Sequence, residues 1–234
     1  MTTVEKSPPF LDAFSDPEHA ARYRDGPPKF VPGFFDLHRM AGVLIRERAP
    51  ADAHVLVHGA GGGLELRSFA TENPDWTFVG VDPALPMLQQ AESLLGADAH
   101  RAQLHHGYID TAPPGPFDAA TSLLTLHFLD ADERRRTVSE ILRRLKPGAP
   151  FVVAHSSFPQ EAAGRDIWLT RYAAFATASG AEPAMAERAR ESVAAVKTMF
   201  DPETDARILR EAGLLQVTAF YAAFTWCGWV GHAP

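Results

Sequence analysis

The chain of 234 residues contains a single cysteine, Cys227, and only four lysines among its 22 basic residues. One cysteine excludes an intrachain disulfide framework and a cysteine-rich zinc module. No stretch approaches the ~18 consecutive apolar residues of a membrane-spanning helix, and the first residues lack the basic and apolar regions of a secretory signal. From these absences we predict a cytoplasmic protein with no membrane partner.

The charge balance is acidic, with 22 Lys and Arg against 29 Asp and Glu and a formal net charge of −7. Such a surface is poorly suited to contact a phosphate backbone over a broad area. The sequence has no HExxH motif, and the neighbours His105 and His106 would point to opposite faces of a strand. We therefore expect neither a nucleic acid partner nor a bound metal.

From about residue 51 onward, short aliphatic runs alternate with helical patterns, as in successive β–α–β units. Five runs predict parallel strands, at 54–58, 77–81, 103–106, 119–124 and 151–155. Two later β-rich runs, separated by two alanines, predict an antiparallel hairpin at the sheet edge, at 215–221 and 224–230. The pattern predicts an α/β fold, a Rossmann-like, doubly wound, mostly parallel sheet with a C-terminal hairpin.

We interpret residues 1–234 as one domain with four parts. They are a helical N-terminal extension (1–50), a ligand-binding core (51–158), a helical cap insert (159–200), and a last helix with the β-hairpin (201–234). The extension and the insert are both long enough to cover a ligand site.

A glycine-rich segment, Gly59-Ala60-Gly61-Gly62-Gly63, directly follows the first predicted strand. Glycines let a backbone pass close beneath a ligand, and a helix beginning at Leu64 would present unpaired N–H groups there. The third glycine of a dinucleotide-binding G-x-G-x-x-G motif would fall on Leu64, so the spacing here is G-x-G-x-G.

Nineteen residues after Gly63, Asp82 ends the second strand, where its carboxylate would accept both hydroxyls of an adenosine ribose. This placement serves NAD and S-adenosylmethionine (SAM) equally. Capping of the following helix is the alternative role of Asp82. A second helix start is indicated by Asp130 and Glu133, which have the spacing of a capping box.

Taken together, these motifs resemble those of class I SAM-dependent methyltransferases. The resemblance includes Asp82, the Thr-Leu-His-Phe-Leu run at 125–129, the Leu-Lys-Pro-Gly helix end at 145–148 and the terminal hairpin. It implies SAM as cofactor, S-adenosylhomocysteine (SAH) as product and methyl transfer to a small-molecule acceptor. The cofactor-binding residues that it implies are Gly59, Ala60, Gly61, Gly63, Asp82, Pro83, Met87, Tyr108, Ile109 and Leu123.

Two positions depart from the usual pattern of this family. His58 ends the first strand in place of the usual Asp or Glu, and Tyr108 stands where an acid often accepts adenine N6. A non-catalytic module that binds SAM or another nucleotide therefore remains an alternative.

Within the superfamily, the chain resembles the carboxy-SAM synthase group in its Val-Pro-Gly-aromatic segment, residues 31–34, and in the 125–129 run. That group has a tyrosine and an asparagine where this chain has Phe34 and Leu123, while Arg190 falls near the arginine that holds the extra carboxylate. Because two hydrogen-bonding positions are apolar here, we favour methyl transfer and keep carboxy-SAM synthesis as the alternative.

No motif identifies the acceptor, because a SAM-dependent transfer requires mainly alignment of the acceptor with the methyl carbon. His127 is the one catalytic candidate, as a group that orients or deprotonates the acceptor. Phe34, Tyr172 and Arg190 are the substrate candidates. Aromatic residues are expected to enclose a small, partly apolar acceptor, namely Phe34, Phe35, Trp168, Tyr172 and Phe175. A homodimer is left open.

Overall fold

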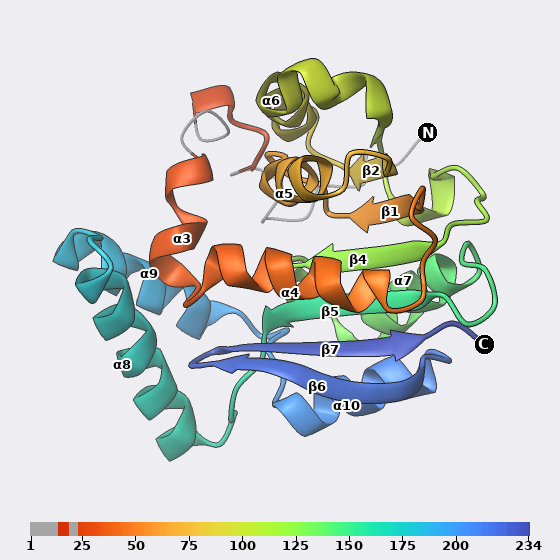
Figure 1. The fold of residues 1–234 in the computed structure, drawn as a ribbon. Helices are drawn as coiled ribbons and strands as arrows, with labels where there is room; N and C mark the ends of the chain where they lie inside the picture. The colour runs from red at the N-terminus through yellow and green to blue at the C-terminus, as the bar shows by residue number, and fades with distance from the viewer. Residues whose placement is uncertain (1–13, 19–22) are drawn as a thin grey trace, which may run out of the picture.

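A computed structural model describes residues 14–18 and 23–234 of the chain (Figure 1). They fold around a seven-stranded sheet with the order β3-β2-β1-β4-β5-β7-β6. The strands are β1 (His54–His58), β2 (Thr77–Asp82), β3 (Ala102–His106), β4 (Ala119–Leu123), β5 (Pro150–Ser156), β6 (Leu215–Ala223) and β7 (Trp226–His232). The first five pair in parallel, whereas β7 is antiparallel to both β5 and β6. The predicted Rossmann-like fold with a terminal hairpin is confirmed.

Helices cover both faces of this sheet (Figure 1). The longer ones are α4 (Phe34–Arg46), α5 (Leu64–Glu72), α6 (Leu85–Leu95), α7 (Ala131–Leu142), α8 (Ala162–Ala178), α9 (Pro183–Ala195) and α10 (Pro202–Glu211). Shorter turns are η1 (Tyr23–Asp25), α3 (Pro27–Phe30), η2 (Gly96–Arg101), η3 (Ile109–Thr111) and η4 (Leu126–Phe128). Most buried apolar side chains of α4, α5 and α6 belong to one core cluster, and most of those of α7 and α10 belong to a second.

The alternation of side chains along the strands creates the two cores. Val55 and Val57 of β1 pack with α4 and α5, while Leu56 between them packs with α7. Every residue of β5 is buried. This is the pattern expected of a parallel strand that is covered by helices on both faces.

The hairpin is present, but its turn is displaced from the predicted position. Strand β6 continues to Ala223, so Phe224 and Thr225 form the turn instead of the two alanines before them. Phe224 takes a left-handed backbone conformation with φ of 53°. Apolar periodicity alone did not locate this turn, because the residues at the reversal are as β-prone as those of the strands.

The helix signals differ in accuracy. Asp130 and Glu133 form the predicted capping box at the start of α7. Asp82, in contrast, does not cap α6, whose N-cap is Ala84. Its carboxylate accepts a hydrogen bond from the Ala84 backbone N–H just before the helix begins.

The cap insert consists of α8 and α9, which pack against each other and, through α8, against α3. Phe30 of α3 and Tyr172 of α8 place their ring centroids 5.5 Å apart. The predicted helical extension, residues 1–50, falls partly outside the described residues, and its described part includes α3 and α4. Within the described residues, we find no helix whose length and apolar character would let it cross a membrane.

Candidate functional site

A cavity of about 1860 Å³ lies at the carboxyl ends of β1, β2 and β4. Ligands of open α/β sheets bind at this edge, at the point where the strand order reverses, which here lies between β1 and β4. Small-molecule pockets usually measure roughly 300–1000 Å³. The cavity therefore has room for two ligands side by side.

The glycine loop forms part of the cavity floor through Gly59 and Gly61. Gly59 has φ of 75°, and a Cβ there would lie 2.0 Å from the Thr125 hydroxyl oxygen. Gly63 has φ of 81°, and a Cβ there would lie 2.6 Å from the Ala91 Cα. These glycines thus let the loop after β4 and helix α6 pack directly onto the loop after β1.

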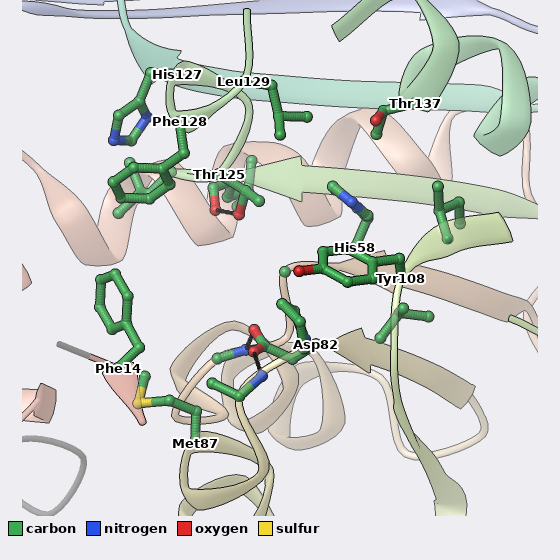
Figure 2. Close-up of a pocket in the computed structure, with 18 of the residues that line it drawn as sticks. Phe14, His58, Asp82, Met87, Tyr108, Thr125, His127, Phe128, Leu129 and Thr137 are labelled. Atoms are coloured by element: carbon green, nitrogen blue, oxygen red, sulfur yellow. Dashed lines mark hydrogen bonds between the residues drawn. The ribbon is translucent and has the colours of Figure 1, made fainter. Parts of the chain in front are cut away.

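Asp82 connects the loops after β1 and β2 (Figure 2). Its Oδ2 accepts a hydrogen bond of 2.9 Å from the Gly61 N–H, and its Oδ1 accepts one of 2.8 Å from the Ala84 N–H. Burial raises the pKa of the carboxyl, and the two backbone donors oppose that shift. Each oxygen keeps acceptor capacity for a ligand hydroxyl, because a carboxylate oxygen accepts about two hydrogen bonds.

The structure brings most of the predicted cofactor residues together around Asp82. Residues in the cavity lining besides the two glycines and Asp82 are Pro83, Met87, Tyr108, Ile109 and Leu123. Tyr108 is 49% exposed and forms the outer wall opposite Asp82 (Figure 2). Ala60 and Gly63 lie instead in a smaller depression of about 30 Å³ beside the cavity, which also contains Gly59 and Leu123.

Two histidines of the cavity lining, the half-buried His58 and the buried His127, lack a charge near pH 7. Nδ1 of His58 lies 3.0 Å from the Ser122 hydroxyl, and burial lowers the pKa of His58 to about 4. His127 packs against Phe128 with ring centroids 4.2 Å apart, and burial lowers its pKa well below the usual range. The buried Nδ1 of His127 has no hydrogen-bond partner.

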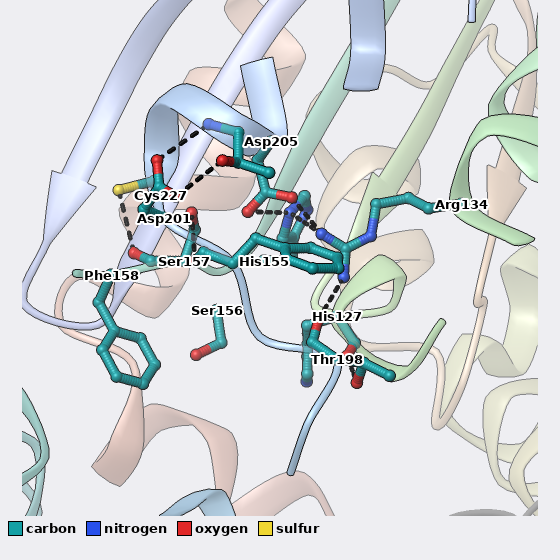
Figure 3. A network of polar contacts seen from close by, with 12 residues as sticks. His127, Arg134, His155, Ser156, Ser157, Phe158, Thr198, Asp201, Asp205 and Cys227 are labelled. Carbon is teal, nitrogen blue, oxygen red and sulfur yellow. Dashed lines mark hydrogen bonds and ion pairs between the residues drawn. The ribbon is translucent and has the colours of Figure 1, made fainter. Parts of the chain in front are cut away.

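A buried polar network holds the loop that carries His127 (Figure 3). Arg134 of α7 forms an ion pair with Asp205 of α10, and neither side chain is exposed. Arg134 also donates to the Leu129 carbonyl at 3.1 Å and to the Thr198 carbonyl at 2.9 Å. The Thr198 hydroxyl in turn donates to the His127 carbonyl at 2.7 Å. The network joins the loop after β4 to the segment that returns from the cap insert.

The predicted substrate residues are dispersed. Tyr172 lines the cavity, and Phe34 lines the smaller depression. Arg190 of α9 is absent from both linings and forms ion pairs with Glu187 at 2.6 Å and Asp166 at 3.7 Å. Both of its partners lie in the cap insert itself.

The other aromatic residues expected to enclose an acceptor lie outside the cavity lining. Phe35 is 59% exposed. Trp168 packs beside a separate cluster around Phe158, and Phe175 lies against Phe224 with ring centroids 5.8 Å apart. Of that predicted set, only Tyr172 contributes to the cavity wall.

Several lining residues come from parts of the chain that carry no motif. They are Phe14, Phe30, Met185 and Val193. The sequence shows that these residues are apolar. It does not show that they line one cavity, because they come from well-separated segments. Among the residues that the structure describes, no group of three or more His, Cys, Asp or Glu side chains is arranged to hold a metal ion.

Comparison with known proteins gives one family match and several distant relatives. Residues 55–148 match the methyltransferase domain family. The chain is similar to a carboxy-S-adenosyl-L-methionine synthase of Chromohalobacter salexigens, with 26% identity over 197 residues, 82% of this chain and 72% of that protein.

Two solved structures have a similar fold. An O-methyltransferase family protein from Burkholderia thailandensis is 18% identical with a TM-score of 0.65, covering 94% of this chain and 61% of that one. PigF with SAH is 14% identical with a TM-score of 0.67, covering 98% of this chain and 63% of that one. The chain thus spans less than two thirds of the length of either protein, and the likeness shows a shared fold.

Proposed function

Because residues 55–148 form a methyltransferase domain of the class I SAM-dependent superfamily, we propose that this chain binds SAM and methylates a small-molecule acceptor. One observation carries the proposal. The glycine loop meets Asp82 through the Gly61 N–H on the floor of a cavity that continues beneath the cap insert. The glycine loop and Asp82 would bind a nucleoside, and the remaining volume of the cavity would hold the acceptor.

In this proposal, the cofactor lies along the carboxyl ends of β1 and β2. Asp82 accepts hydrogen bonds from the ribose hydroxyls, and Met87 and Tyr108 flank the adenine. The glycine loop and Leu123 contact the methionine part. Tyr108 offers a ring face and a hydroxyl in place of the acid that often meets adenine N6. These roles are supported by the position of Asp82, Met87, Tyr108, Leu123, Gly59 and Gly61 in one cavity lining.

The acceptor occupies the half of the cavity beneath the cap. When bound, SAM supplies an activated methyl group, so the chain has to align the acceptor and exclude water. The walls of this half include Phe30, Tyr172, Val193 and Trp226. An aromatic and aliphatic wall suits a small, partly apolar acceptor.

His127 is the proposed positioning residue for the acceptor. Its imidazole is neutral near pH 7, lines the cavity and has an unpartnered Nδ1. A neutral imidazole accepts a hydrogen bond from a hydroxyl or amine and so fixes the direction of the lone pair of that group. The same low pKa makes His127 a weak base. We therefore propose that it orients the acceptor and does not remove a proton from it.

Carboxy-SAM synthesis is the second candidate, and the named relative from Chromohalobacter salexigens supports it. The residues of this chain favour methyl transfer instead. Phe34 and Leu123 offer no hydrogen bond to an additional carboxylate. Arg190 is engaged by Glu187 and Asp166 in the cap.

Mass spectrometry of the ligand extracted from the purified protein tests this choice. We expect SAM or SAH. Recovery of carboxy-SAM, or its formation from SAM and prephenate, would instead support the second candidate and assign Arg190 to the carboxylate.

Calorimetric titration tests the cofactor itself. We expect heat from SAH and none from NADH. A response to NADH alone would overturn the proposal and favour an oxidoreductase. A protein that binds SAH but transfers no methyl group to a metabolite extract would be a non-catalytic binding module.

We further propose that the partner is a metabolite and not a nucleic acid, because the net charge of −7 disfavours a phosphate backbone. A gel-shift assay with tRNA checks this expectation. Salt-sensitive binding in that assay would contradict it.

A further inference from the structure

A buried carboxyl beside the glycine loop has no role in the function proposed above. Glu65 lies in the first turn of α5 and is only 6% exposed. Its Oε1 is buried without a hydrogen-bond partner. A carboxyl oxygen that is buried without a partner costs stability, so a ligand group that pairs with Oε1 would recover part of that cost.

Glu65 faces the region where the cofactor's amino-acid part would lie. It lines the smaller depression of about 30 Å³ together with the whole glycine loop. Gly59, Gly61, Leu123 and Leu124 belong both to this depression and to the large cavity. The depression is therefore an inner recess of the cavity, at the end of β1 and β4.

Among the described residues that line the recess with Glu65, none is a lysine or an arginine that could neutralise its charge. Burial raises the pKa of Glu65 to about 8, and the nearby Thr121 hydroxyl opposes this shift only in part. His38 of α4, which lines the same recess, is neutral because burial lowers its pKa to about 4. Tyr23 also lines the recess, and burial together with the Asp82 and Glu65 charges raises its pKa to about 12.

One arginine of the neighbouring helix α4 and one of α5 itself are engaged elsewhere. Arg46 of α4 donates to the Asn73 side chain at 2.8 Å, and Arg67 of α5 pairs with Asp98 at 2.8 Å. A ligand cation would thus meet a single carboxylate in this recess, with no lysine or arginine among the lining residues to repel it.

We propose that the Glu65 carboxylate receives the α-ammonium group of SAM and SAH, in place of an acid at the end of β1, where this chain has His58. This inference rests on the proposed function. No side chain caps the first turn of α5, so its positive end is available to the ligand's α-carboxylate. The first turn of α5 would then bind both the ammonium group, through Glu65, and the α-carboxylate, through its backbone N–H groups.

Titration calorimetry with two ligands tests this assignment. SAH carries the α-ammonium group, and 5′-methylthioadenosine lacks the amino-acid part while keeping the nucleoside. In Glu65→Gln, we expect SAH affinity to fall tenfold to a hundredfold, since a charge-assisted bond is lost, and 5′-methylthioadenosine affinity to stay within about twofold. Glu72→Gln, on the exposed end of the same helix, is the matched control and leaves both affinities unchanged.

The pH dependence of SAH binding gives a second readout. Glu65 is mostly protonated in the free protein below its pKa of about 8, and pairing with an ammonium group favours the ionised form. Binding then releases a proton, so SAH affinity rises between pH 6 and 7.5, by up to about tenfold per pH unit. This slope is absent from Glu65→Gln and from 5′-methylthioadenosine binding.

Other outcomes would overturn the assignment. Equal SAH affinity in Glu65→Gln and the parent protein would make the carboxyl structural only. An SAH affinity that falls as pH rises would mean that the neutral acid donates to the ligand's carboxylate. If the parent protein binds 5′-methylthioadenosine and SAH equally well, the cofactor site stands and the Glu65 assignment fails. If it binds neither ligand, the proposed function itself fails.

Discussion

The two halves of the cavity differ in the chemical groups that line them. The cofactor half, at the ends of β1 and β2, presents backbone N–H groups and the Asp82 carboxylate, which are joined through Gly61. The proposed acceptor half, beneath α3, α8 and α9, presents apolar side chains and the neutral His127. A site made of backbone groups tolerates sequence change outside it, whereas a site made of side chains changes with each substitution. We infer that the acceptor half is where this chain's specificity resides.

The largest expected effect comes from the network that supports the acceptor half. Arg134→Ala should lower the free energy of unfolding by about 3–5 kcal/mol, because it leaves the Asp205 charge buried without its partner. Urea denaturation measures the change. The exposed Arg136→Ala on the same helix should change stability by less than about 0.5 kcal/mol.

A double variant separates the ion pair from the packing around it. Arg134→Met combined with Asp205→Leu should recover most of the lost stability, since no buried charge remains. A single Arg134→Ala variant as stable as the parent would show that the network does not support the acceptor half.

The next largest effect concerns the cofactor half. Asp82→Asn should weaken SAH binding about tenfold to a hundredfold, because the ribose hydroxyls lose a charged acceptor. Calorimetric titration measures the affinity. Asp75→Asn, at the opposite end of β2, is the control and should bind SAH as the parent does. Unchanged affinity in Asp82→Asn would restrict Asp82 to holding the loops together.

A smaller effect is expected at His58, which lines the cavity at the end of β1. Its pKa of about 4 in the folded protein is below the unfolded value of about 6.5. Between these values, the unfolded state binds a proton that the folded state does not, so stability falls as pH falls. From pH 7 to pH 5, this amounts to about 2 kcal/mol.

Substitution of His58 isolates this contribution. In His58→Gln, the loss of unfolding free energy between pH 7 and pH 5 should shrink by about 2 kcal/mol. Urea denaturation at the two pH values gives the comparison. An equal acid loss in His58→Gln and the parent would contradict burial of a neutral imidazole.

The smallest effect is expected from a change in the wall of the proposed acceptor half, which should alter acceptor turnover but not cofactor binding. Tyr172→Leu should lower kcat/KM for the acceptor about tenfold, since one wall of the acceptor half is reshaped, and should leave SAH affinity within about twofold. Phe175→Leu, on the same helix but outside the cavity, is the matched control. A loss of SAH affinity equal to the loss in kcat/KM would mean that the two halves are not separate.

The sequence by itself determined the sheet and predicted the residues that we propose to bind the cofactor. Aliphatic runs predicted β1 to β5, and the spacing from the glycine loop to Asp82 predicted which strand ends would meet. This succeeded because strand and turn preferences are local properties of the backbone, and the carboxyl ends of neighbouring parallel strands necessarily lie at one edge. The sequence analysis did not single out Glu65, because an acid in the first turn of a helix is an ordinary sequence feature.

Only the tertiary structure decided the acceptor half and the recess around Glu65. Trp226 of β7 donates to the Phe30 carbonyl at 2.9 Å, and Tyr221 of β6 donates to the Pro32 carbonyl at 2.6 Å. These bonds join segments almost two hundred residues apart, and no spacing rule relates them. Which aromatic residues face the cavity, and whether a carboxyl finds a partner, depends on how whole helices pack against the sheet, because burial and charge are set by neighbours from distant parts of the chain.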